Sequence, residues 1–96
     1  MKVKIDVKMY DSDGKEVANP GKPSLTLRDV IVNSILTYKE GEGKKEKYEK
    51  YSLFKRLKDA KSEIDFTVEE IVLIKECIGQ FQAQLIMGQC FDLLDK

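Results

Sequence analysis

The chain has 96 residues, of which 42% are hydrophobic and 35% are charged, a composition typical of one soluble globular domain. Seventeen basic residues balance seventeen acidic residues, and histidine and tryptophan are absent. Without histidine, the chain lacks the commonest general base and the usual partner of a nucleophilic serine or cysteine. We therefore expect a protein that is not an enzyme and that uses no cofactor and no metal ion.

Charge is distributed unevenly along the chain. Residues 39–61 contain nine basic and five acidic residues, whereas residues 62–96 contain two basic and seven acidic residues. Two interpretations follow. The two regions either form separate solvated faces, or they contact each other within one molecule or between two copies.

Cys77 and Cys90 lie in apolar contexts and lack the paired spacing of a metal site or a redox motif. Two buried thiols are the expected outcome. The N-terminal residues alternate in polarity, unlike a signal peptide, and no stretch approaches the ~20 apolar residues that cross a bilayer. These features predict a cytoplasmic protein with no membrane contact.

Residues 1–23 predict a β-hairpin region. Charged residues alternate there with Val3, Ile5, Val7 and Met9, as in a strand with one buried face. The "DSDGK" sequence at 11–15 predicts a turn, after which residues 16–18 can pair back on the first strand. Pro20 and Pro23 then end regular structure. Because an isolated hairpin is marginally stable, this one must pack on helices or extend another sheet.

The stretch "SLTLRDVIVNSILTY" at 24–38 predicts the first helix, with a strand at 30–32 as the alternative. Thr26 is the expected N-cap, and Asp29 stands three residues later, as in a capping box. Helical spacing then predicts one apolar side, formed by Leu27, Val30, Ile31, Ser34, Ile35 and Tyr38.

A mobile charged loop is expected at about 39–45, followed by a second helix over 44–60. Aromatic and apolar side chains recur there every three residues, at Tyr48, Tyr51, Phe54 and Leu57. The simplest interpretation is that this stripe packs on the first and third helices. In the alternative, it is an exposed anchor for a partner protein. The "SEIDF" stretch at 62–66 is either a brief strand or a connection pinned to the core.

A third helix begins after Thr67, where Glu70 completes a capping box and Phe66 and Ile71 form a hydrophobic staple. Its inward side is expected to consist of Ile71, Ile74, Ile78 and Phe81, widened by Val68, Leu73 and Cys77. Gly79 is expected to end or bend this helix. A fourth helix over 82–94 then buries Ala83, Met87, Cys90, Phe91 and Leu94.

Together these elements predict an α+β fold. One domain spans residues 1–96, in which the N-terminal β-hairpin packs on the three to four α-helices of residues 24–96.

Several stretches carry a resemblance to a known group of proteins. They are "LTLRDVIVNSIL", the lysine- and tyrosine-rich helix, "IDFTVEEIVLIKECIG" and "MGQCFDLLD", and the resemblance covers about residues 25–94. This pattern resembles small uncharacterised proteins of tailed bacteriophages and prophages. The resemblance implies a phage-derived accessory or assembly protein working in the cytoplasm of a bacterium, and it implies no catalytic residues.

Two functions are compatible with these features. The preferred one is binding to another protein, or to a second copy, through Tyr48, Tyr51 and Phe54 or through a free hairpin edge. The alternative is nucleic-acid binding, for which phosphate contacts would come from Lys44, Lys45, Lys47, Lys55, Arg56 and Lys58. Against the alternative, Glu46 and Glu49 interrupt the basic run, and residues 82–94 contain no lysine or arginine.

Two pairs of acids are candidate catalytic groups, but each has a simpler structural explanation. Helix-terminal electrostatics explain Glu69 and Glu70, and an alternating solvent-facing side explains Glu63 and Asp65.

Overall fold

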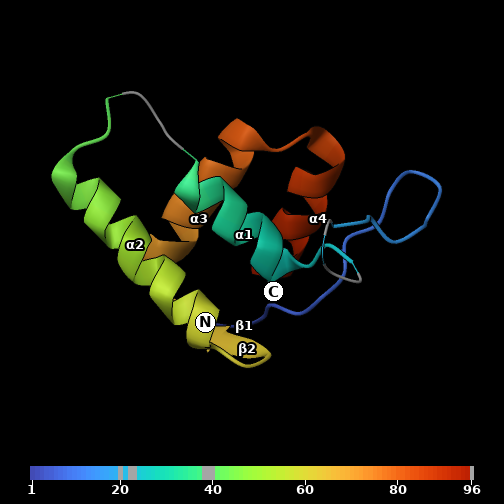
Figure 1. Ribbon diagram of the computed structural model, residues 1–96, viewed down its shortest axis with the longest axis horizontal. Helices are drawn as coiled ribbons and strands as arrows, with labels where there is room; N and C mark the ends of the chain where they lie inside the picture. The colour runs from blue at the N-terminus through green and yellow to red at the C-terminus, as the bar shows by residue number, and fades with distance from the viewer. Residues whose placement is uncertain (20, 22–23, 38–40, 96) are drawn as a thin grey trace.

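A computed structural model describes residues 1–19, 21, 24–37 and 41–95. In chain order, the described residues form β1 (Lys2–Lys4), α1 (Leu27–Leu36), α2 (Lys44–Asp59), β2 (Glu63–Asp65), α3 (Val68–Phe81) and α4 (Gln84–Leu94). Figure 1 shows the two short strands below the helices, with β1 and β2 close to the end of α2. The predicted α+β fold is confirmed.

Strand β1 pairs with β2 in an antiparallel two-stranded sheet. Val3 faces Ile64 across the pair, and both side chains are buried, while the flanking residues of each strand are exposed. This alternation is what a sheet with one covered face requires. The brief strand predicted as one alternative for "SEIDF" is therefore present, and it pairs with the N-terminal strand about 60 residues away.

The N-terminal segment continues beyond β1 and folds back as predicted. Tyr10 forms an isolated antiparallel bridge with Glu16, and the backbone N–H of Val17 donates to the Met9 carbonyl at 3.0 Å. Gly14 adopts a φ of +79° in the connecting turn, a conformation that L side chains rarely adopt. Met9 is fully buried, so the segment is held to the core by its apolar side.

Helix α1 begins at the predicted cap. The Asp29 carboxylate accepts a hydrogen bond from the backbone N–H of Thr26 at 3.1 Å, and the Thr26 hydroxyl accepts one from the N–H of Asp29. The predicted apolar side is buried at Leu27, Val30, Ile31, Ser34 and Ile35. Tyr38, both prolines and residues 39 and 40 of the predicted loop lie outside the described residues.

Helix α3 also has its predicted capping box, between Thr67 and Glu70. Two expectations for this region are wrong. Val68 is 66% exposed because, at about 100° per residue, it lies about 120° around the helix axis from the fully buried Ile74. Gly79 does not end the helix, which continues to Phe81 and stops where Gln82 becomes extended.

Helix α4 also differs in part from its prediction. Ala83, expected to be buried, is exposed because it is the N-cap that precedes α4. Cys90 and Leu94 are buried as predicted, and Met87 and Phe91 are partly buried against the core.

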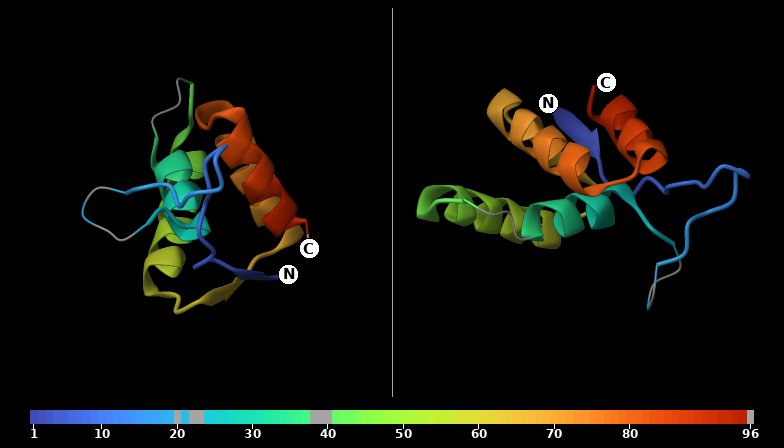
Figure 2. Two further views of the ribbon diagram at one scale, coloured as in Figure 1. Left: turned by 90° about the vertical axis from the view of Figure 1, so that its right-hand side faces the viewer. Right: turned by 90° about the horizontal axis from the view of Figure 1, so that it is seen from above.

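The buried side chains of the strands and helices form one hydrophobic cluster. Helix α1 packs against both α2 and α3, and α4 packs against α3 and β1. Figure 2 shows the consequence, with α2 beside α1 and with α4 on the far side of α3. Helix α2 therefore lies at the edge of the molecule, with much of its surface uncovered.

Candidate functional site

Helix α2 faces the core with one narrow row of side chains. Leu53 and Leu57 are buried in this row, and Phe54 is partly buried beside them. Residues three, four or seven positions apart share one side of a helix, so Lys50 belongs to the same row. The long opposite side of α2 is exposed to solvent.

Lys50 is 4% exposed and forms an ion pair with Glu42, which is also buried. Burial lowers the pKa of Lys50, but the hydrogen bond to Glu42 and the neighbouring Cys77 raise it more, so the pKa lies above its ordinary value. This buried pair was not predicted, although the spacing of Lys50, Leu53 and Leu57 places Lys50 on the buried side of the helix. Its role is to hold the start of α2 against the core.

The simplest interpretation of the aromatic stripe is wrong for two of its members, because Tyr48 is 69% exposed and Tyr51 is 50% exposed. Three residues correspond to about 300° of helical turn, so each step of three moves a side chain about 60° around the axis. Starting from the buried Leu57, the stripe winds away from the core and reaches the opposite side at Tyr48. The two tyrosine rings lie together, with centroids 6.3 Å apart.

Four lysines share this exposed side of α2 with the tyrosines, because their spacing repeats every three or four residues. The Lys55 ammonium lies 5.5 Å from the centroid of the Tyr51 ring, in a cation–π contact. Within the described residues, no acid forms an ion pair with any of the four. We call this surface the lysine–tyrosine face; it consists of Lys44, Lys47, Tyr48, Tyr51, Lys55 and Lys58.

The remaining predicted site residues lie elsewhere. Phe54 packs against the core, and Lys45 projects from a neighbouring row of α2. Arg56 forms an ion pair with Glu70 of α3 and donates a hydrogen bond to the Asp65 carbonyl at 2.6 Å. Arg56 therefore joins α2 to the start of α3.

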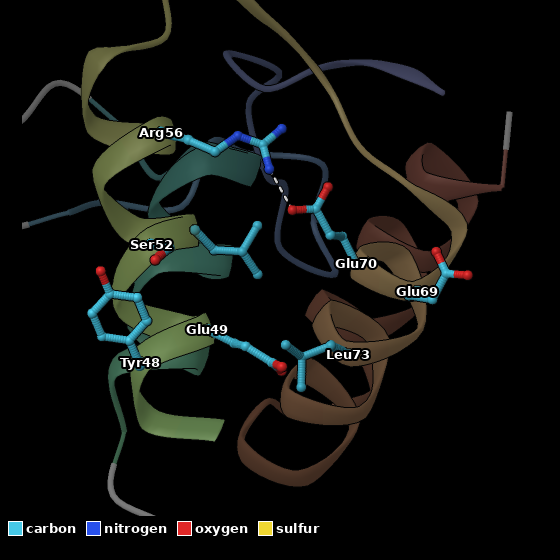
Figure 3. Close-up of a pocket in the computed structure, with 8 residues that line it drawn as sticks. Tyr48, Glu49, Ser52, Arg56, Glu69, Glu70 and Leu73 are labelled. Carbon is cyan, nitrogen blue, oxygen red and sulfur yellow. Dashed lines mark hydrogen bonds and ion pairs between the residues drawn. The ribbon is translucent and has the colours of Figure 1, made fainter. Parts of the chain in front are cut away.

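A groove of about 490 Å³ runs between α2 and α3. Leu53 and Leu73 supply apolar surface along it, and Figure 3 shows the Arg56–Glu70 pair crossing one end. Tyr48 stands on the α2 side and points outward from the groove. The groove was not predicted, because the packing distance between two helices has no sequence signal of its own.

The acids in and near this groove do not converge. Figure 3 shows the Glu70 carboxylate turned toward Arg56, whereas Glu69 projects from the far side of α3. Glu70 also accepts the backbone N–H of Thr67 at 2.9 Å, so its carboxylate is committed to the helix cap. On β2, the hydrogen bond from the Met1 amino group lowers the pKa of Asp65. These contacts give Glu70 and Asp65 structural roles.

Both cysteines are buried, as predicted. Burial raises the pKa of the Cys90 thiol to about 12, and the sulfur lies 3.9 Å from the Met9 sulfur. A thiol with such a pKa is protonated at neutral pH and is a poor nucleophile.

Among the described residues, no group of three or more histidine, cysteine, aspartate or glutamate side chains is placed to hold a metal ion. None of the helices formed by these residues is both long and apolar enough to cross a bilayer. Comparisons of the chain with protein-family models, with curated proteins and with solved structures give no match.

Proposed function

We propose that this chain is a non-catalytic accessory protein of phage or prophage origin that binds another protein in the bacterial cytoplasm through its lysine–tyrosine face. The observation that carries the proposal is the exposure of Tyr48 and Tyr51 on the outer side of α2. The sequence resemblance to phage and prophage proteins supports the origin. The structural roles of Glu70 and Asp65 support a function in binding.

Exposed tyrosines are suited to this role because they lose little side-chain entropy and combine an apolar ring with a hydroxyl. Covering about 100 Å² of apolar surface on each ring would contribute about 2.5 kcal/mol. The four lysines beside them would favour a partner with an acidic surface and would accelerate its approach. The partner is either a component of virion assembly or part of a host system.

Affinity capture from phage-infected bacteria tests the proposal. We expect the Tyr48→Ala/Tyr51→Ala double variant to lose at least about tenfold of the specifically bound protein, since each ring contributes at the kcal/mol scale. Tyr10→Ala is the matched control, because Tyr10 is 43% exposed on the N-terminal segment, away from α2. Equal capture by the double variant and the wild type would contradict the proposal.

Nucleic-acid binding is the second candidate, and one observation favours it. Glu46 and Glu49, which interrupt the basic run in the sequence, fall outside the lysine–tyrosine face, and Glu49 lines the groove toward α3. The face thus combines lysines with stackable rings, as surfaces that bind single strands do. A titration with single-stranded DNA across salt concentrations would show an affinity that falls steeply with salt. Absence of binding at low salt would reject this candidate.

A further inference from the structure

A small cavity lies between the end of α1 and the first half of α2, at one border of the lysine–tyrosine face. Its volume is about 220 Å³, and Leu36, Lys47 and Tyr51 are among the residues that line it. Pockets that enclose drug-sized ligands have volumes of roughly 300–1,000 Å³. This smaller cavity therefore matches the size of one side chain better than that of a whole ligand. We call it the α1–α2 pocket.

Apolar side chains from both helices line the α1–α2 pocket. Leu36, the last residue of α1, is 53% exposed, and Tyr51 of α2 is 50% exposed. Ile35, which is buried beside Leu36, adds apolar surface. Removing apolar surface from water is favourable, and an aromatic ring gains a further contribution when it packs against another ring. The lining of the pocket therefore favours an aromatic occupant.

The α1–α2 pocket has a net positive charge. Glu42 and Lys50 line it, but these two buried side chains neutralise each other in their ion pair. Lys47 also lines it, is exposed, and forms no ion pair with any acid among the described residues. Lys44, three residues earlier in α2, projects from the same side of the helix. An occupant with a negative charge beside its apolar part would complement this pocket.

We propose that the α1–α2 pocket receives one aromatic side chain of a partner protein, and that an acid adjacent to this side chain in the partner's sequence pairs with Lys47. This inference rests on the proposed function, since it names the part of the partner that contacts the lysine–tyrosine face. The partner's ring packs between Leu36 and Tyr51. A large anchor in a pocket, with charged groups around it, is the usual arrangement of an interface hot spot.

Both parts of this contact are needed for selectivity. A basic segment with the same aromatic residue would bring a like charge to Lys47, which disfavours association. An acidic segment without the ring would pair with an exposed lysine only, and exposed ion pairs contribute little by themselves. The pocket therefore selects acidic segments that carry an aromatic residue.

A titration followed by NMR of the isotope-labelled protein tests the proposal with three short peptides at about 0.15 M salt. The probe is acetyl-Glu-Phe-Glu-amide, for which we expect saturable shifts of the backbone N–H groups of residues 35–37, 47 and 51. We expect a dissociation constant of about 1 mM, because a single buried side chain supplies most of the affinity. Acetyl-Glu-Ala-Glu-amide lacks the ring, and acetyl-Lys-Phe-Lys-amide reverses the charge. The peptide without the ring should bind at least about tenfold more weakly than the probe, and the basic peptide at least about fivefold more weakly.

Two matched pairs of variants locate the contact. Leu36→Ser should weaken binding of the acidic aromatic peptide about tenfold, whereas Leu85→Ser, at a similarly exposed leucine of α4, should leave it unchanged. Lys47→Glu should weaken it about fivefold, whereas Lys45→Glu should leave it unchanged. Lys45 lies about 200° around the α2 axis from Lys47, and salt at this concentration screens charges beyond about 8 Å. The dispersion of the NMR spectrum shows that each variant is folded.

The outcomes separate this inference from the proposed function. It is overturned if the acidic aromatic peptide gives no saturable shifts, if its shifts map outside the α1–α2 pocket, or if the basic peptide binds equally well. If Tyr48→Ala/Tyr51→Ala still loses the captured partner in that case, the proposed function stands and the anchor lies elsewhere on the lysine–tyrosine face. If the peptide binds as expected but the double variant captures its partner like the wild type, the pocket stands and the proposed function fails.

Discussion

Two ion pairs of this protein, Lys50–Glu42 and Lys8–Glu16, differ mainly in their exposure to water. The side chains of the first pair are each 5% exposed, whereas those of the second are 49% and 45% exposed. An exposed pair contributes little because water and salt screen it, whereas removing one partner of a buried pair leaves an uncompensated charge. Burial, and not the number of ion pairs, determines which charged residues matter for stability.

We predict that Glu42→Gln lowers the free energy of unfolding by about 3 kcal/mol, whereas Glu16→Gln lowers it by less than about 1 kcal/mol. The pKa of Lys50 is raised by folding, so the stabilisation from this pair is complete below about pH 10.5 and is lost as the pH rises above that value. Urea unfolding at neutral pH, repeated at strongly alkaline pH, measures both effects. Equal losses for the two variants at neutral pH would contradict this assignment.

Helices α1 and α3 begin where local chemistry directs them. Thr26 and Thr67 each complete a capping box, and such caps satisfy backbone N–H groups that have no partner within the helix. The C-terminal end of α3 does not follow from a local signal, since the helix continues through Gly79. A Cβ added at Gly79 would lie 3.9 Å from the Phe91 ring, which is ordinary contact. Gly79 therefore costs helix stability without serving a turn.

We predict that Gly79→Ala raises the free energy of unfolding by about 0.5–1 kcal/mol, because alanine has the higher helix propensity and loses less backbone entropy. Gly14→Ala should have the opposite sign and cost about 1 kcal/mol, since Gly14 has a φ of +79°. Thermal and urea unfolding of the two variants give the comparison. A destabilised Gly79→Ala protein would mean that the helix needs glycine there.

At the scale of the whole molecule, the N-terminal segment joins parts of the chain that are distant in sequence. Ile5 is fully buried, its N–H donates to the Ser62 carbonyl at 3.0 Å, and its carbonyl accepts from the N–H of Arg28 at 2.8 Å. The side chain of Gln89 in α4 donates to the Tyr10 carbonyl at 2.8 Å. The segment thus connects the starts of α1 and β2 with α4.

We predict that Ile5→Ala lowers the free energy of unfolding by about 2–5 kcal/mol, through lost burial and the cavity left behind. Lys4→Ala, one residue earlier and exposed, should change it by less than about 0.5 kcal/mol. Urea unfolding followed by circular dichroism compares the two. Similar effects at both positions would show that the alternation of this segment does not govern its packing.

The sequence by itself determined the features that depend on neighbours a few residues away. Capping residues, helical spacing and strand alternation predicted all four helices, the buried row of α1 and the buried face of β1. The exception was α2. Its aromatic residues recur every three positions, which predicted a buried stripe, but side chains at that spacing wind around the helix. The candidate site was therefore predicted as a set of residues, but its exposure was not.

Only the tertiary structure decided what each surface faces. The pairing of β1 with β2, the burial of Lys50 with Glu42, the groove between α2 and α3, and the exposure of Tyr48 and Tyr51 all depend on which elements meet. The physical reason is that local propensities act over one or two turns of chain, whereas burial is shared among segments far apart in sequence. A helix at the edge of the molecule, such as α2, receives its buried side from its neighbours.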